Sequence, residues 1–233
     1  PGWDNRHMYV PNHFAMSTDQ IHELLGGVGA ADLVTAHESG LVATFLPFLF
    51  DPDVGDHGAL ITHVARNNSQ ATQPVVGDAM VIVHGAEHYV SPRWLASLAE
   101  DGRVVPTWNY VTVHAYGHLI VHDDATWTED CVRRLTSVHE TSYSVDQVPA
   151  EYIERMLRAI VGIEIRLTRV EAKAKMSQNK RPEDVRGIVD GLRADAGDDL
   201  AVLTAAWMEQ NSVPAADRRS ALLERVAGTQ RQG

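Results

Sequence analysis

Cysteine and lysine are scarce in this sequence, and long apolar runs are absent. Cys131 is the single cysteine among 233 residues, which excludes an internal disulfide and any metal site built from several thiolates. No apolar segment approaches the ~20 residues that a membrane-spanning helix needs. Residues 1–7 also lack the apolar stretch of a secretory signal. We therefore expect a globular protein of the cytoplasm that makes no membrane contact.

Basic residues are few in the first two thirds of the chain. Residues 1–150 contain 18 acidic and six basic residues, whereas 151–233 contain 13 acidic and 14 basic ones, and the formal net charge is -11. A phosphate backbone would be repelled by the first part and would gain little from the second. The charge argues against DNA or RNA binding through a broad basic surface and favours a small-molecule partner, while a local basic patch, or a dimer that presents one, stays open.

Common nucleotide and metalloprotease motifs are also missing. The sequence contains no Walker loop, no HExxH and no GxGxxG, and Gly26-Gly27-Val28-Gly29 follows a predicted helix instead of a strand. Histidine, in contrast, is plentiful, and all 12 histidines lie between His7 and His139. Imidazole is the commonest metal ligand and the usual proton carrier near neutral pH. This distribution points to chemistry in the first part of the chain.

Hydrophobic patterns predict strands first and helices afterwards. Ser17-Thr18-Asp19 supplies an N-cap for an early helix. Short strand-like runs separated by turn residues follow, at a spacing typical of an antiparallel barrel or sandwich. The expected strands are 32–36, 41–50, 59–65, 79–84, 88–91 and 110–122.

The remainder is predicted to be mostly helical. One helix is expected after Asp123 or Asp124, with Cys131 on its apolar face, and another from about Pro149. Pro182 fits the first turn of a third helix. One further strand is expected at 162–170 and two more helices at 198–210 and 215–226. The predicted fold class is α+β, with an antiparallel β-core, inserted helices and a helical C-terminus.

The strand at 110–122 separates polar from apolar side chains. Its odd positions are apolar or small, and a period of two places its even positions on the opposite face. That face is either solvated and paired across strands or part of a polar cleft. It contains His114, Tyr116, His118 and His122.

Three further segments contain candidate binding residues. His63 and Arg66 lie near a strand end, where imidazole suits a metal and guanidinium suits a phosphate or carboxylate. Trp108-Asn109-Tyr110 could stack on a flat ring, or could pack in the core. Lys175–Lys180 contains two of the three lysines together with Ser177 and Gln178, which could hold a phosphate or a propionate, or could be an exposed loop.

Taken together, several ordered segments resemble the PaiB-like family, whose members are usually named FMN-binding negative transcriptional regulators. The resemblance covers about residues 8–205. The matching segments are Met8–Phe14, Leu46-Pro47, His63–Arg66 with Asn68, Tyr89–Trp94, Val104–Tyr110, Val113–Gly117, Met156–Gly162 and Lys175–Asn179.

This resemblance implies a split β-barrel that forms a homodimer, with a cofactor at the subunit interface. The antiparallel core expected from the residues agrees with it. We place the split-barrel domain with its inserted helices at residues 8–176 and a C-terminal helical extension at 177–233.

Two cofactors follow from the resemblance. FMN is one; heme b is the other, because heme-dependent piperazate synthases, which form an N–N bond, are similar to PaiB proteins. Their iron ligand lies in a segment like His63–Arg66, so the resemblance makes His63 the metal ligand here. Two departures bear on flavin binding: Ala71 stands where the family has a tryptophan, and Leu98 where it has a lysine.

The resulting hypothesis is a heme enzyme that acts on a small nitrogen-containing metabolite. The alternatives are an FMN-binding negative transcriptional regulator and a split barrel that has lost its cofactor and serves as a binding module. The residues expected to bind the cofactor are His63, Arg66, Trp108, Tyr110, Lys175, Ser177 and Gln178. Among them, Arg66 and Lys175 would bind the heme propionates or a substrate carboxylate. The expected proton carrier is His114 or Tyr116.

Overall fold

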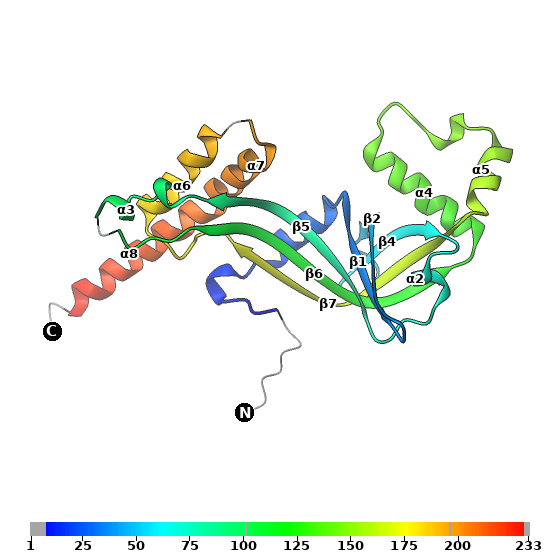
Figure 1. Ribbon diagram of the computed structural model, residues 1–233, viewed down its shortest axis with the longest axis horizontal. Helices are drawn as coiled ribbons and strands as arrows, with labels where there is room; N and C mark the ends of the chain where they lie inside the picture. Colours follow the sequence, from blue (N-terminus) through cyan, green and yellow to red (C-terminus); the bar gives the residue numbers. More distant parts are fainter. Residues whose placement is uncertain (1–7, 101, 196, 231–233) are drawn as a thin grey trace. The chain divides into compact units, whose positions relative to one another are not determined.

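A seven-stranded sheet is the main feature of the fold (Figure 1). The computed structural model describes residues 8–100, 102–195 and 197–230. The strand order is β2-β1-β5-β6-β7-β4-β3, and the pairs β1–β2, β1–β5, β3–β4 and β4–β7 are antiparallel. The α+β split-barrel prediction is confirmed. The strands are β1 Ala30–His37, β2 Gly40–Pro47, β3 Leu49–Asp51, β4 Ala59–Ala65, β5 Ala79–Val90, β6 Thr107–His122 and β7 Ile160–Lys175.

Helices begin where the sequence provides caps. Ser17 and Gln20 form a reciprocal capping box on α1, and the Asp124 carboxylate accepts from the Trp127 amide at the start of α4. Pro182 occupies the first turn of α6, as predicted. The helices are α1 Thr18–Gly26, α2 Ser69–Thr72, α3 Ser97–Glu100, α4 Ala125–His139, α5 Ala150–Leu157, α6 Pro182–Ala194, α7 Asp199–Trp207 and α8 Val213–Gln230, with 3-10 turns at Asn12–Phe14, Pro92–Trp94 and Val145–Gln147 and a π-helix, Met208–Ser212, between α7 and α8.

The chain divides into two compact units. The first, here called the barrel unit, contains residues 17–83 and 113–171. The second, here called the helical unit, contains the described residues of 1–16, 84–112 and 172–233. Strands β5, β6 and β7 contribute residues to both units. The domain boundary expected at residue 176 stays a prediction.

Strand boundaries differ from the sequence expectation in three places. The run 41–50 is two strands, because Phe48 is fully buried between them and its amide bonds to the Gly29 carbonyl at 3.2 Å. The runs 79–84 and 88–91 are one strand, β5, since its backbone stays extended through the polar residues between them. The strand expected at 162–170 extends from Ile160 to Lys175.

The core of the barrel unit follows the predicted alternation. Val111, Val113, Ala115 and Gly117 of β6 are buried, although Val111 belongs to the helical unit. The alternation fails at the end of β6, where Val121 is 39% exposed. Cys131 packs on α4 with Leu49, Ile61 and Leu135, which confirms its apolar environment. In the described part of the chain, no helix has both the length and the apolar character that crossing a bilayer requires.

Candidate functional site

A basic cavity lies in the helical unit. It has a volume of about 220 Å³ and is defined here as the lysine cavity. Six of its eight lining residues have a hydroxyl, amide or ammonium group, and the other two are apolar. Its lining residues are Phe14, Val105, Thr107, Asn109, Lys175, Ser177, Asn179 and Lys180.

The lysines at this cavity have no acidic partners among the described residues. Lys175 Nζ donates to Thr107 Oγ1 at 2.5 Å and to the Trp108 carbonyl at 2.6 Å. Burial, followed by repulsion from Lys173 and Lys180, lowers the pKa of Lys175 below its ordinary 10.5. Positive charge therefore accumulates here without compensation, in a chain whose net charge is -11.

The turn after β7 is a buried part of this site. The Ser177 hydroxyl donates to Asn109 Oδ1 at 2.9 Å, and Gln178 bonds both the Met176 amide and the Ala174 carbonyl. Ser177 and Gln178 are 3% and 9% exposed, so the interpretation as an exposed loop is wrong for them, whereas Asn179 is exposed. Their polar groups shape the cavity from within the protein, and a direct contact with a cofactor stays a prediction.

Aromatic side chains flank the part of β6 that Lys175 contacts. Trp108 is 50% exposed, which contradicts core packing at the strand entrance, and its Nε1 donates to Glu87 Oε2 at 3.0 Å. Tyr89 lies beside it, with ring centroids 6.2 Å apart. The Tyr110 ring lies 5.8 Å from Lys175 Nζ. An exposed ring held by a carboxylate is available for stacking.

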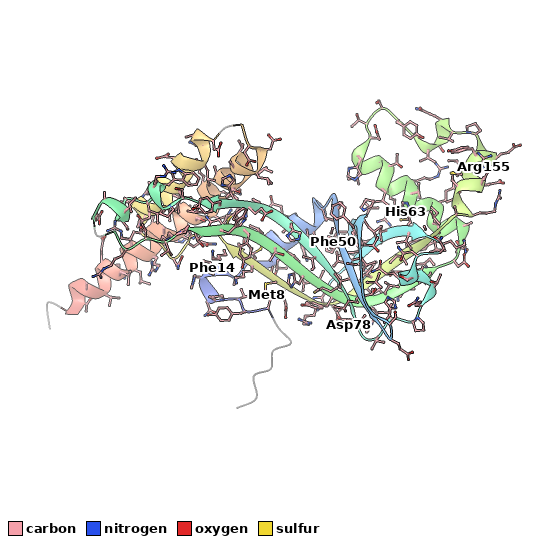
Figure 2. The ribbon with its side chains drawn as sticks, in the orientation of Figure 1. Met8, Phe14, Phe50, His63, Asp78 and Arg155 are labelled. Atoms are coloured by element: carbon pink, nitrogen blue, oxygen red, sulfur yellow. The ribbon has the colours of Figure 1, made fainter. Side chains whose placement is uncertain are left out.

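His63 lies in the barrel unit, on β4 under α4 (Figure 2). It pairs across the sheet with Gly162, and directly opposite residues point to the same face. A Cβ on Gly162 would lie 2.1 Å from the Trp127 ring of α4, so His63 faces that helix. Its Nδ1 is buried and has no hydrogen-bond partner, and burial lowers the pKa of the ring. The imidazole is therefore neutral at pH 7, the form that binds metals.

Arg66 is engaged in local contacts. Its Nη1 donates to Asp123 Oδ1 at 2.6 Å, and its Nε donates to the Arg158 carbonyl at 2.9 Å. It borders a second cavity of about 340 Å³, where Asp123, Asp124, Glu129 and Glu154 outnumber the arginines. A propionate at Arg66 would meet this acidic surface, and the predicted role of Arg66 stays a prediction.

The polar face of β6 holds the two candidate proton carriers together. The rings of His114 and Tyr116 pack edge to face with centroids 6.4 Å apart. The Arg169 guanidinium lies over the Tyr116 ring at 3.7 Å, and His118 pairs with Asp78 at 3.2 Å. The face is thus paired across neighbouring strands, as one of the two sequence interpretations expected.

The sequence did not reveal an ion-pair network around the buried Glu164. His122 Nε2 lies 2.7 Å from Glu164 Oε2, and the His122 ring stacks on Trp127 with centroids 4.0 Å apart. Burial raises the pKa of Glu164, but hydrogen bonds from Arg166 and His122 lower it by a larger amount. The net result is a pKa below its ordinary value. Glu164 is a charged residue within an apolar run of β7. This interruption of the run is the one signal in the sequence that could have indicated a buried carboxylate with a paired side chain.

The strand order and the accompanying helices define an α+β split-barrel protein. The chain belongs to the family described as “Putative FMN-binding domain”, whose model matches residues 8–169. The lysine-bearing turn after β7 therefore lies just beyond the matched residues.

Relatives and solved structures agree with this assignment. An uncharacterized protein of Emericella nidulans is 30% identical, over 72% of this chain and 84% of its own. “Protease synthase and sporulation protein PAI 2” of Bacillus subtilis is 27% identical, over 80% and 89%, which confirms the resemblance to PaiB proteins. The flavocytochrome Anf3 of Azotobacter vinelandii superposes with a TM-score of 0.52 at 14% identity, over 73% of each chain. At that identity, the superposition supports the fold alone.

Proposed function

We propose that this protein binds FMN, with the flavin phosphate in the lysine cavity. The supporting observation is the group of lysines that has no described carboxylate partner beside hydroxyl and amide donors. Such donors suit a phosphate, because charge-assisted hydrogen bonds are the stronger ones. Lys175 and Lys180 would hold the phosphate, and Trp108 or Tyr110 would contact the ring.

This assignment also bears on the two departures from the family pattern. Ala71 and Leu98 remove a ring-stacking side chain and a cation from their family positions. In our proposal, Trp108 and Lys175 take over these two tasks. Bound FMN would supply hydride or electron transfer, while this chain binds the phosphate and limits the access of water to it.

The first test compares FMN with riboflavin, which lacks the phosphate. Fluorescence quenching should give an affinity for FMN at least about tenfold above that for riboflavin, since two charge-assisted contacts are lost. Lys175→Met should reduce the affinity for FMN and leave that for riboflavin unchanged. Arg225→Met, which removes an exposed cation of α8, is the matched control. Equal affinities of wild-type protein for the two flavins would refute the proposal.

Heme b is the second candidate, because of one observation at His63. Its buried Nδ1 without a partner and its lowered pKa fit the donor chemistry of an axial ligand, although Arg66 is occupied by Asp123. Enzymatic action on a small nitrogen-containing metabolite, at a homodimer interface, would follow from this candidate.

The heme candidate has its own spectroscopic test. Hemin added to the wild-type protein should give a shifted Soret band, and His63→Ala should abolish the shift because the axial nitrogen is lost. His118→Ala, which removes an exposed imidazole of the same unit, is the control. A wild-type spectrum that matches free hemin, or an unchanged shift in His63→Ala, would rule out ligation by His63.

A further inference from the structure

The turn that walls the lysine cavity is tied to the C-terminal helices. The Ser212 hydroxyl donates to the Met176 carbonyl at 2.8 Å, and both residues are buried. Arg219 Nη1 of α8 donates to the Asn179 carbonyl at 2.7 Å. These two bonds hold both ends of the turn, and their donors lie more than forty residues after the end of the family match.

A third tie runs through the π-helix. Asn109 Nδ2 donates to the Met208 sulfur at 3.3 Å, while Asn109 Oδ1 accepts from Ser177. Met208 and Ser212 are the first and last residues of the π-helix, so this short segment contacts both the floor of the cavity and its turn. Single-turn π-helices occur frequently at functional sites.

The turn needs such support because its backbone is strained. Ser177 has a φ of +64°, a left-handed conformation that side chains other than glycine, asparagine and aspartate rarely adopt. Such residues persist only when the surrounding structure fixes them. The hydrogen bonds from Ser177 to Asn109, from Ser212 to Met176 and from Arg219 to Asn179 provide that fixation.

Arg219 differs from its neighbour on α8. The sequence alone favours a solvated surface for the arginines of the C-terminal helices. Both Arg218 and Arg219 are exposed, but the Arg219 guanidinium also donates to a carbonyl of the cavity turn. Two adjacent arginines with different contacts give a matched pair for mutation.

We propose that the C-terminal helices are part of the anion site, with Ser212 and Arg219 as positioning residues for the turn Ser177–Lys180. They hold this turn so that Lys180 and the Asn179 side chain face the cavity. The inference rests on the proposed function, because its effect is on the binding of a phosphate group. Neither residue is proposed to touch the flavin ring.

The experiment measures FMN and riboflavin affinities for variants of the full chain. Arg219→Met and Ser212→Ala should each weaken FMN binding about five- to tenfold, as expected for the loss of one buried or charged hydrogen bond. Riboflavin affinity should stay within about twofold, because the ring contacts are unaltered. Arg219→Lys, which keeps a donor for the Asn179 carbonyl, should restore most of the preference for FMN, and Arg218→Met should leave it at the wild-type value.

The outcomes separate this inference from the proposed function. If the wild-type protein does not prefer FMN, the proposed function fails, and the inference fails with it. If the wild-type protein prefers FMN, and Arg219→Met has the same ratio of FMN affinity to riboflavin affinity as Arg218→Met, only the positioning role fails. Equal loss of FMN and riboflavin binding in Arg219→Met, without rescue by Arg219→Lys, would show a merely structural role and would also overturn the inference.

Discussion

At the residue scale, Gly162 shows how tightly α4 packs on the barrel. The position leaves room for the Trp127 ring, which in turn stacks on His122. The sequence gives no indication of this, since a glycine within a strand is compatible with a bulge, a weak strand or a close approach. The contact joins residues 35 positions apart, and only the fold determines it.

A substitution at this glycine gives a direct test of the packing. Gly162→Ala would place its Cβ 2.1 Å from the Trp127 ring, so the ring must shift and the stack on His122 must open. We expect a loss of about 1–3 kcal/mol in the free energy of unfolding, measured by urea denaturation, as for other overpacked cores. Gly26→Ala, where nothing lies within 4 Å, should be neutral or slightly stabilising. Equal effects of the two changes would contradict this packing.

At the element scale, local signals were predictable and long-range contacts were not. The caps at Ser17 and Asp124 and the first-turn proline Pro182 depend on neighbouring residues, and the sequence predicts all three. The last five residues of β7 are not predicted, because Ala172 and Ala174 alternate there with charged side chains and alanine gives a weak apolar signal. Arg219 meets Asn179 across 40 positions, which no local pattern indicates.

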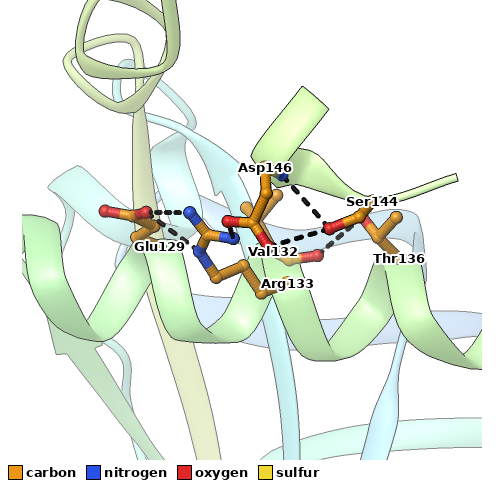
Figure 3. A network of polar contacts seen from close by, with 6 residues as sticks. All are labelled: Glu129, Val132, Arg133, Thr136, Ser144 and Asp146. Atoms are coloured by element: carbon orange, nitrogen blue, oxygen red, sulfur yellow. Dashed lines mark hydrogen bonds and ion pairs between the residues drawn. The ribbon is translucent and has the colours of Figure 1, made fainter. Parts of the chain in front are cut away.

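Another element-scale feature is the attachment of the Val145–Gln147 turn to α4 (Figure 3). Arg133 Nη1 donates to Asp146 Oδ1 at 2.6 Å, while its Nη2 donates to Glu129 Oε1 at 2.7 Å. The Ser144 hydroxyl adds a bond to Asp146 at 3.0 Å. Hydrogen bonds from Arg133 and then Ser144 lower the pKa of Asp146 below its ordinary 3.8.

This shift predicts a loss of stability in acid. The folded state favours ionised Asp146. Its contribution to the free energy of unfolding is therefore complete above pH 3.8 and disappears as the pH falls through the lower pKa of the folded state. We expect Asp146→Asn to lower the Tm slightly at pH 7 and to match wild type at the acid end of the range. The exposed position keeps the effect small. A Tm difference that is constant with pH would exclude this ion pair as its cause.

At the scale of the whole molecule, the distribution of charge is the most informative property. The sequence showed three lysines within eight positions of an acidic chain, and this allowed the anion site to be predicted. It did not show that residues 176–178 are buried, because burial there depends on Asn109 and on the C-terminal helices. Composition therefore indicates an anionic ligand, which stays a prediction, whereas the tertiary contacts define the cavity.

The lowered pKa of Lys175 makes flavin binding depend on pH. Only the ammonium form attracts the phosphate, and binding an anion raises the pKa of that lysine, so binding takes up protons. The affinity for FMN should be constant from pH 7.5 up to the lowered pKa and should then fall, by at most about tenfold per pH unit for one linked proton. Lys175→Arg keeps its charge over this range and should remove the pH dependence below pH 10.5. If FMN titrations of the wild-type protein and of Lys175→Arg showed the same decline with pH, another group would control binding.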